Sequence, residues 1–95
     1  MSYLIITTAN ARLDVQEAIS WENKRSEGLA LRFLADLEEK LAIVARSPYI
    51  YAVRYENVRC ALTDIFPYLI HFVIDDSRQE VIILRILHTS RKPIS

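Results

Sequence analysis

The side chains best suited to chemistry gather near the end of the chain, in the segment Arg-Ile-Leu-His-Thr-Ser-Arg-Lys-Pro. They are Arg85, His88, Arg91 and Lys92, and Arg59 lies on an expected strand that could neighbour this one. A histidine beside guanidinium groups can transfer a proton while the cations hold a phosphate. A solvated strand end, with Lys and Arg kept in water, explains the same residues, and the spacing alone favours it. Both interpretations stay open at the level of the residues.

Two further titratable residues, His71 and Cys60, have simpler expected roles. His71 lies among apolar neighbours in the middle of an expected strand, which is typical of a packed or hydrogen-bonded histidine. Cys60 has no His or Asp pattern beside it, so we expect a small buried side chain. The sequence contains no P-loop, dinucleotide-binding fingerprint, serine nucleophile elbow or metal-ligand spacing. It therefore predicts no metal and no cofactor.

The first half of the chain predicts one strand and two helices. The β-branched and aromatic run Tyr3–Thr7 indicates a strand, and Thr8 or Asn10 can cap the helix that follows. Apolar residues at helical spacing carry that helix to about Lys24. A second helix is expected over Leu29–Arg46, because an apolar stripe runs through it and a proline follows shortly after.

The second half of the chain changes to the two-residue period of β-strands. Three strands are expected, over Val58–Leu62, Tyr68–Ile74 and Glu80–His88. In the last of them Ile82, Leu84 and Ile86 should share one face by strict alternation. Because helices and strands are largely segregated along the chain, the fold class is α+β. We expect an N-terminal strand, an antiparallel helical hairpin and then a three-stranded antiparallel sheet.

Composition limits the kind of protein this can be. The 95 residues include one glycine and three prolines, which indicates one domain, residues 1–95, without a flexible linker. Twelve basic residues balance twelve acidic ones, which argues against broad nonspecific nucleic-acid binding. No signal peptide is evident, and no apolar run approaches the ~20 residues of a membrane span, so we expect a cytoplasmic protein. Charged helix residues, including Glu22 and Asp36, should lie on the solvent-exposed faces of the two helices.

Several short segments occur together in an order that is more specific than any one of them. They are the opening strand before Ala9, Ala30-Leu31-Arg32-Phe33, Ser47-Pro48, Val58-Arg59, Phe66-Pro67-Tyr68-Leu69-Ile70 and Ile86-Leu87-His88-Thr89-Ser90-Arg91-Lys92-Pro93. In this order and spacing the chain resembles the RelE/ParE superfamily over nearly its whole length. The superfamily contains the toxins of bacterial type II toxin–antitoxin pairs, also called plasmid stabilisation proteins.

The resemblance implies two antiparallel helices packed on a twisted antiparallel sheet, and one of two activities. RelE-like members cut mRNA in the ribosomal A site, whereas ParE-like members bind and poison DNA gyrase. An antitoxin protein that wraps over the toxin silences both kinds. For this chain, the nuclease activity implies His88 as the acid–base group, with Arg59 and Arg91 on the scissile phosphate. The gyrase activity implies a target-binding surface of Arg85, His88, Arg91 and Lys92.

Three departures from the nuclease pattern favour the ParE-like branch. Leu69 stands where RelE-like nucleases commonly place an arginine, no tyrosine lies near the end of the chain, and the net charge is zero. The resemblance therefore predicts a toxin that inhibits gyrase by direct binding. An mRNA endonuclease and an inactive partner-binding relative remain the alternatives. The antitoxin is expected to lie over the helical hairpin, with Arg32 and Arg46 facing its acidic residues.

Overall fold

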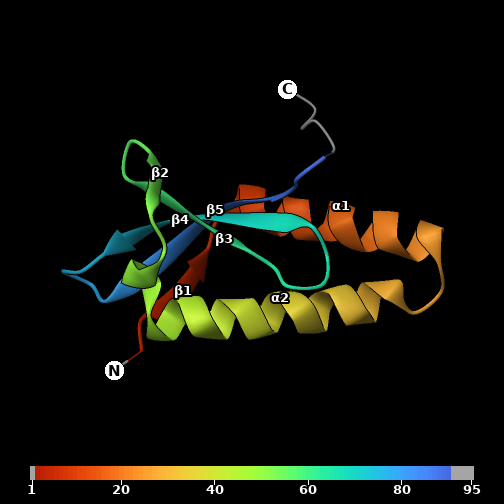
Figure 1. The fold of residues 1–95 in the computed structure, drawn as a ribbon, viewed down its shortest axis with the longest axis horizontal. Coiled ribbons are helices and arrows are strands. Elements are labelled where there is room, and N and C mark those ends of the chain that lie inside the picture. Colours follow the sequence, from red (N-terminus) through yellow and green to blue (C-terminus); the bar gives the residue numbers. More distant parts are fainter. Residues whose placement is uncertain (1, 91–95) are drawn as a thin grey trace.

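The computed structural model describes residues 2–90 and places them in one α+β fold. In chain order the elements are β1 (Leu4–Thr7), α1 (Ala9–Arg25), α2 (Leu29–Arg46), the 3-10 helix η1 (Pro48–Ile50), β2 (Val53–Tyr55), β3 (Val58–Leu62), β4 (Tyr68–Asp75) and β5 (Glu80–His88). The strands form a five-stranded sheet in the order β1-β5-β4-β3-β2, shown in Figure 1. β1 runs parallel to β5, and the other neighbouring strands are antiparallel. The expected fold class is confirmed.

Local signals set the bounds of the two helices. The Thr8 hydroxyl accepts a backbone hydrogen bond at 3.2 Å and caps α1, whereas Asn10 lies inside the helix. Gly28 has φ 87°, a left-handed conformation that favours glycine and allows the chain to reverse into α2. The reversal makes α1 and α2 the predicted antiparallel hairpin (Figure 1). Within residues 2–90, no helix is long and apolar enough to cross a membrane.

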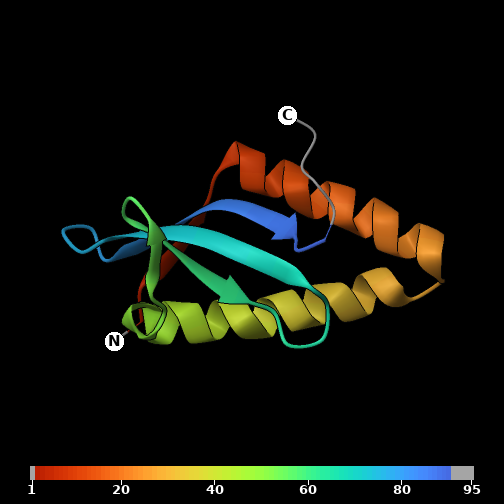
Figure 2. The same ribbon diagram turned by 45° about the horizontal axis from the view of Figure 1, so that its top comes forward.

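The two helices pack on one face of the sheet, and no element of residues 2–90 covers the other (Figure 2). On the covered side, called the helix face below, Phe33 of α2 packs against Tyr68 of β4 with ring centroids 4.6 Å apart. Ile70 and Phe72 of β4 point the same way and are fully buried. The opposite side, called the outer face, carries Cys60, Leu62, Leu69 and His71. The helices therefore shield the helix face of the sheet from solvent and leave the outer face accessible.

Strict alternation fails in β5 because the strand contains a bulge. The pairing with β4 steps from Ile83 to Arg85 and leaves Leu84 as an extra residue. Beyond Leu84 the two faces exchange, so that Ile86 is 3% exposed and joins the core. The prediction that Ile86 shares a face with Ile82 was therefore wrong. An uninterrupted run of apolar residues contains no sequence signal that would predict a bulge.

The sequence did not reveal β2. This strand has three residues, all exposed, and it pairs with β3 through a shifted register. An exposed strand of this length has no apolar alternation to detect. It forms the edge of the sheet opposite β1.

Two of the charged helix residues that were expected on solvent-exposed faces are buried. Glu22 is fully buried, and it accepts hydrogen bonds from the Tyr68 hydroxyl at 2.9 Å and from Arg25 at 2.7 Å. Asp36 is 5% exposed and accepts three backbone N–H bonds from residues 64–66. Several of these donors lie far away in the sequence, so helical periodicity could not indicate them.

Candidate functional site

Arg59 lies at the start of β3 on the helix face, close to η1. It pairs across the ladder with the buried Phe72, so the two side chains share a face. Its Nη1 donates a hydrogen bond to the Tyr51 carbonyl at 2.6 Å. The guanidinium carbon lies 4.9 Å from the centroid of the Tyr49 ring, a cation–π arrangement. These contacts hold the Arg59 charge against η1.

His88 lies at the end of β5, in contact with the core. It pairs with Tyr68, and the two rings meet edge to face with centroids 5.1 Å apart. Its Nδ1 accepts the backbone N–H of Ser90 at 3.1 Å. Because the Tyr68 hydroxyl donates to Glu22, a chain of contacts joins His88 to α1.

The structure does not bring Arg59 and His88 together. Their partners in β4 are four positions apart, which separates the two residues by roughly 13 Å along the strand direction at ~3.3 Å per residue. Two strand spacings across the sheet add to this separation. Arg91, the third residue of the proposed nuclease set, lies outside the described residues, and so does Lys92.

Arg85 is held by an ion pair to α1. Its Nε and Nη2 donate to the two carboxylate oxygens of Asp14 at 2.8 and 3.0 Å. The hydrogen bond to this carboxylate raises the pKa of Arg85. Asp14, which is 8% exposed, also accepts the backbone N–H of Ile86 at 2.9 Å. Arg85 therefore ties β5 to α1 beside the bulge.

A second group of polar side chains, called the outer-face cluster below, gathers around His71. The strand pairing places Cys60 and Arg85 on either side of His71. The His71 Nδ1 lies 3.1 Å from the Tyr55 hydroxyl and 3.5 Å from the Cys60 thiol. Burial lowers the pKa of His71, and the charges of Arg54 and Arg85 lower it further. The imidazole is therefore neutral at neutral pH.

The outer-face cluster suits proton transfer better than nucleophilic catalysis. Burial raises the pKa of the Cys60 thiol, which keeps it protonated and weakly reactive. The Tyr55 hydroxyl and the Cys60 thiol can each donate to Nδ1 of His71 or accept from it, depending on the tautomer of the ring. Across residues 2–90, no group of three or more His, Cys, Asp or Glu side chains could hold a metal ion.

Sequence reasoning assigned His71 and Cys60 to packing, and it missed their association with Tyr55. The two residues are indeed partly buried and hydrogen-bonded. What brings the cluster together is the register of β3 against β4 and the position of β2, neither of which period-two alternation specifies. The only sequence signal was the presence of a histidine and a cysteine on consecutive expected strands.

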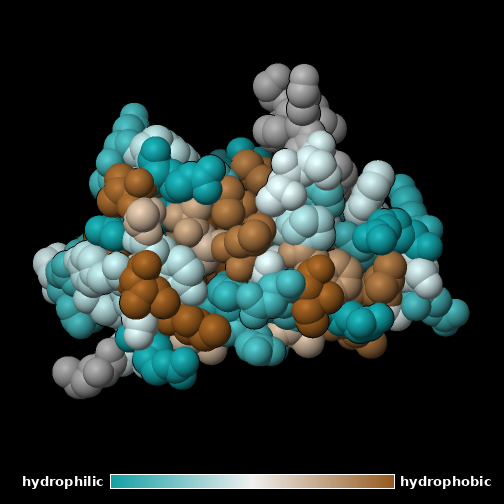
Figure 3. Space-filling view, viewed as in Figure 1, coloured by the Kyte–Doolittle hydropathy of each residue, from teal (hydrophilic) through white to brown (hydrophobic). Residues whose placement is uncertain are grey.

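The helical hairpin presents cations and apolar side chains to solvent. Arg32 and Arg46 are both exposed on α2. Leu31 beside Arg32 is 74% exposed, and Leu13 of α1 is 60% exposed. Figure 3 shows separate hydrophobic areas among hydrophilic ones on the face that it draws. The hairpin thus has the mixed surface that a protein partner can cover.

The sequence matches a family profile over nearly its whole length. Residues 5–93 match the family described as ParE toxin of type II toxin-antitoxin system, parDE. The chain belongs to this family of ParE toxins. The comparison with curated proteins gives no match.

Solved structures share the fold of this ParE-family chain. A chromosomal ParDE system from P. aeruginosa has a TM-score of 0.78 at 19% identity, covering 92% of this chain and 96% of that one. The RelBE2 toxin–antitoxin complex from Mycobacterium tuberculosis has a TM-score of 0.69 at 24% identity, covering 96% and 95%. The intact E. coli RelBE complex has a TM-score of 0.65 at 17% identity, covering 95% and 100%. The resemblance to the RelE/ParE superfamily is thereby confirmed, while the shared fold does not separate its two branches.

Proposed function

We propose that this ParE-family toxin arrests growth by binding DNA gyrase. The observation that carries the proposal is the match to the ParE toxin family over residues 5–93. Two further features support it: the net charge is zero, and Arg59 and His88 are far apart on the helix face. Because gyrase acts on chromosomal DNA, the proposal places the protein in the cytoplasm.

The surface we assign to gyrase is the C-terminal end of β5. His88 lies there, and Arg91 and Lys92 follow it in the sequence. Arg85 would act indirectly, because its guanidinium is bound to Asp14 and fixes the strand rather than reaching outward. No cofactor is needed for inhibition by binding.

A supercoiling assay tests the proposal. Purified protein is added to gyrase and relaxed plasmid, and both supercoiling and trapped cleavage complexes are measured. We expect inhibition at protein concentrations on the order of 1 μM, typical of a regulatory protein interface. If the protein causes no inhibition and traps no cleavage complexes at that concentration, the gyrase assignment is wrong.

We also propose that a cognate antitoxin covers the helical hairpin. The similar structures from M. tuberculosis and E. coli are toxin–antitoxin complexes. The hairpin exposes Leu13 near the start of α1, and Leu31 beside Arg32 near the start of α2. A disordered segment that folds on this surface and buries ~1,500–2,500 Å² would suit nanomolar or tighter binding. Ion pairs at the rim, made by Arg32 and Arg46 with acidic residues, would each add only ~0–1 kcal/mol. The short edge strands β1 and β2 could accept an added strand.

Hydrogen exchange with and without the antitoxin tests this arrangement. We expect new protection over residues 10–46 and along β1 or β2. Unchanged exchange in those segments, in a complex shown to be formed, would refute the proposed covering mode.

One observation favours a second function, the ribosome-dependent cutting of mRNA. The neutral His71, hydrogen-bonded to Tyr55, lies between the charges of Arg54 and Arg85. A neutral imidazole can take the proton of a ribose 2′-OH while a guanidinium group, here that of Arg54, stabilises the phosphate. The outer-face cluster thus places an acid–base group near a cation, whereas Arg59 and His88 lie too far apart to act together.

A translation extract separates this second function from the first. The native chain is compared with His71→Ala and His88→Ala for site-specific mRNA cuts. Loss of a catalytic acid–base group should reduce cutting by about 10²–10⁴-fold, so the variant that loses activity identifies the group. If the native chain makes no cuts, the nuclease alternative is wrong.

A further inference from the structure

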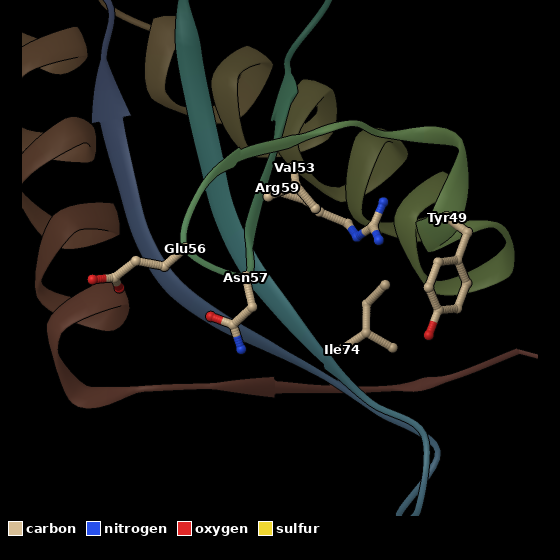
Figure 4. Close-up of a pocket in the computed structure, with 6 residues that line it drawn as sticks. All are labelled: Tyr49, Val53, Glu56, Asn57, Arg59 and Ile74. Atoms are coloured by element: carbon tan, nitrogen blue, oxygen red, sulfur yellow. The ribbon is translucent and has the colours of Figure 1, made fainter.

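A small cavity opens on the helix face, between η1 and the turn that joins β2 to β3. It measures about 230 Å³ and is lined by Tyr49, Val53, Glu56, Asn57, Arg59 and Ile74. Pairing places Val53 beside Arg59 on the same face, while Ile74 lies farther along β4. Figure 4 shows that Arg59, Tyr49 and Ile74 border a common space. We call it the Arg59 cavity.

The walls of the Arg59 cavity are held in place. The Tyr49 hydroxyl donates to Asp76 in the β4–β5 hairpin, which also accepts from the Tyr3 hydroxyl at 2.6 Å. Arg59 is fixed by the Tyr51 carbonyl and by the Tyr49 ring. A ligand would meet groups that are already ordered, so it would lose little affinity to ordering them.

The charge inside the Arg59 cavity selects a singly charged anion. A guanidinium carries five N–H donors, and the bond to Tyr51 uses one of them. A carboxylate can take two parallel N–H bonds from such a group. Arg59 is the one cation among the residues that line the cavity, and in Figure 4 the Glu56 carboxylate points away from it. A single guanidinium balances one negative charge, so a phosphate dianion would be less well matched.

The volume and the apolar walls of the Arg59 cavity suit an amino-acid side chain better than a nucleotide. Sites for drug-sized ligands usually measure about 300–1,000 Å³, and this cavity is smaller. Val53 and Ile74 offer aliphatic surface suited to methylene groups next to the charge. A glutamate side chain has this combination of an aliphatic stem and a planar carboxylate.

We propose that the Arg59 cavity binds a carboxylate carried by a peptide, either an acidic side chain or a free C-terminus. Val53 and Ile74 contact the aliphatic part, and Arg59 receives the carboxylate. The inference stands apart from the gyrase proposal, since it concerns a different surface and a different partner chemistry.

A titration followed by ¹⁵N–¹H NMR tests the inference with three short peptides and one inorganic anion. The first peptide is acetyl-Leu-Glu-Leu-amide, the second replaces Glu by Gln, and the third is acetyl-Leu-Gln-Leu with a free C-terminus. Inorganic phosphate is the fourth probe. We expect the amides of residues 53, 57, 59 and 74 to shift with a Kd on the order of 1 mM for the first or the third peptide. Which of these two binds tells an acidic side chain from a free C-terminus.

Variants connect the shifts to the cavity. Arg59→Gln should weaken carboxylate binding about tenfold by removing a charged hydrogen bond. Val53→Glu keeps Arg59, adds a negative charge at the exposed edge strand and should weaken binding similarly. Arg78→Gln is the matched control, because it removes an exposed cation in the β4–β5 hairpin, outside the cavity lining, and should change nothing.

Four outcomes would overturn the inference. Equal binding of the Gln-amide peptide would show that the carboxylate is not recognised, and stronger binding of phosphate would contradict the selected charge. Shifts that persist unchanged in both Arg59→Gln and Val53→Glu, or no shifts from any probe, would show that the cavity is not a carboxylate site. None of these results depends on whether the protein inhibits gyrase.

Discussion

At the scale of single residues, the Asp14 carboxylate joins α1 to β5 through three hydrogen bonds. It accepts two N–H bonds from Arg85 and one from the backbone of Ile86, just beyond the β5 bulge. The N–H of Ile86 lies past the last residue paired with β1, so the sheet does not satisfy it. Asp14 replaces the missing strand partner with a side chain from α1.

Replacing Asp14 should therefore destabilise the fold more than replacing its cationic partner. We expect Asp14→Ala to lower the free energy of unfolding by about 2–3 kcal/mol, because a buried N–H and a guanidinium lose their acceptor. Arg85→Gln should cost about 1 kcal/mol, since the Arg85 side chain is 40% exposed and Asp14 keeps the Ile86 bond. Urea denaturation measures both. A negligible loss in Asp14→Ala would contradict this role.

His71 gives the protein a predictable pH dependence. Its folded pKa lies below the unfolded value, so the unfolded chain binds the proton more readily. Stability should therefore fall as the pH is lowered through the unfolded pKa of about 6.5. Compared with His71→Gln, the wild type should lose more stability between about pH 7.5 and pH 5.5. A wild type that gains stability relative to the variant over this range would contradict the predicted sign.

At the scale of elements, Asp36 of α2 organises the loop between β3 and β4. Its oxygens accept the N–H groups of Asp64, Ile65 and Phe66 at 3.3, 3.0 and 2.8 Å. The loop thereby closes over the core, where Phe66 meets Phe33 edge to face with centroids 5.9 Å apart. The loop between β3 and β4 is thus built on a helix carboxylate.

Removing the Asp36 carboxylate should loosen this loop. We expect Asp36→Ala to cost about 3 kcal/mol of unfolding free energy, and Asp36→Asn less, because the amide oxygen still accepts. Glu39→Gln on the exposed face of α2 is the control and should stay within about 0.5 kcal/mol. Hydrogen exchange at residues 64–66 should accelerate in Asp36→Ala and stay unchanged in the control Glu39→Gln. Unchanged exchange there would show that the loop does not depend on Asp36.

At the scale of the whole molecule, local patterns predicted both helices and four of the five strands of residues 2–90, with β1 indicated by its β-branched and aromatic run. Periodicity located α1, α2, β3, β4 and β5 because each buries an apolar face of regular spacing. It missed β2, which buries nothing, and the bulge at Leu84, which exchanges the faces of β5. Periodicity also predicted that Glu22 and Asp36 are exposed to solvent, because it cannot detect hydrogen-bond partners that lie far along the chain.

The candidate sites show the same limit more sharply. Sequence reasoning chose Arg59 and His88 by residue type, and the sheet register places them far apart. The same register brings Tyr55 to Cys60 and His71, and residue type alone had assigned those last two residues to packing. Arg59 instead borders a cavity with residues of η1, β2 and β4. Strand pairing decides which side chains meet, and a single sequence does not specify it.

We propose that this ParE-family chain arrests growth as a toxin and that a partner protein neutralises it. Growth after induction in a bacterial host is the decisive measurement, with the amount of folded protein measured in the same cells. We predict strong arrest when the chain is expressed alone and normal growth when the neighbouring gene is co-expressed. Unimpaired growth with abundant folded protein would contradict the claim and indicate a relative that only binds a partner.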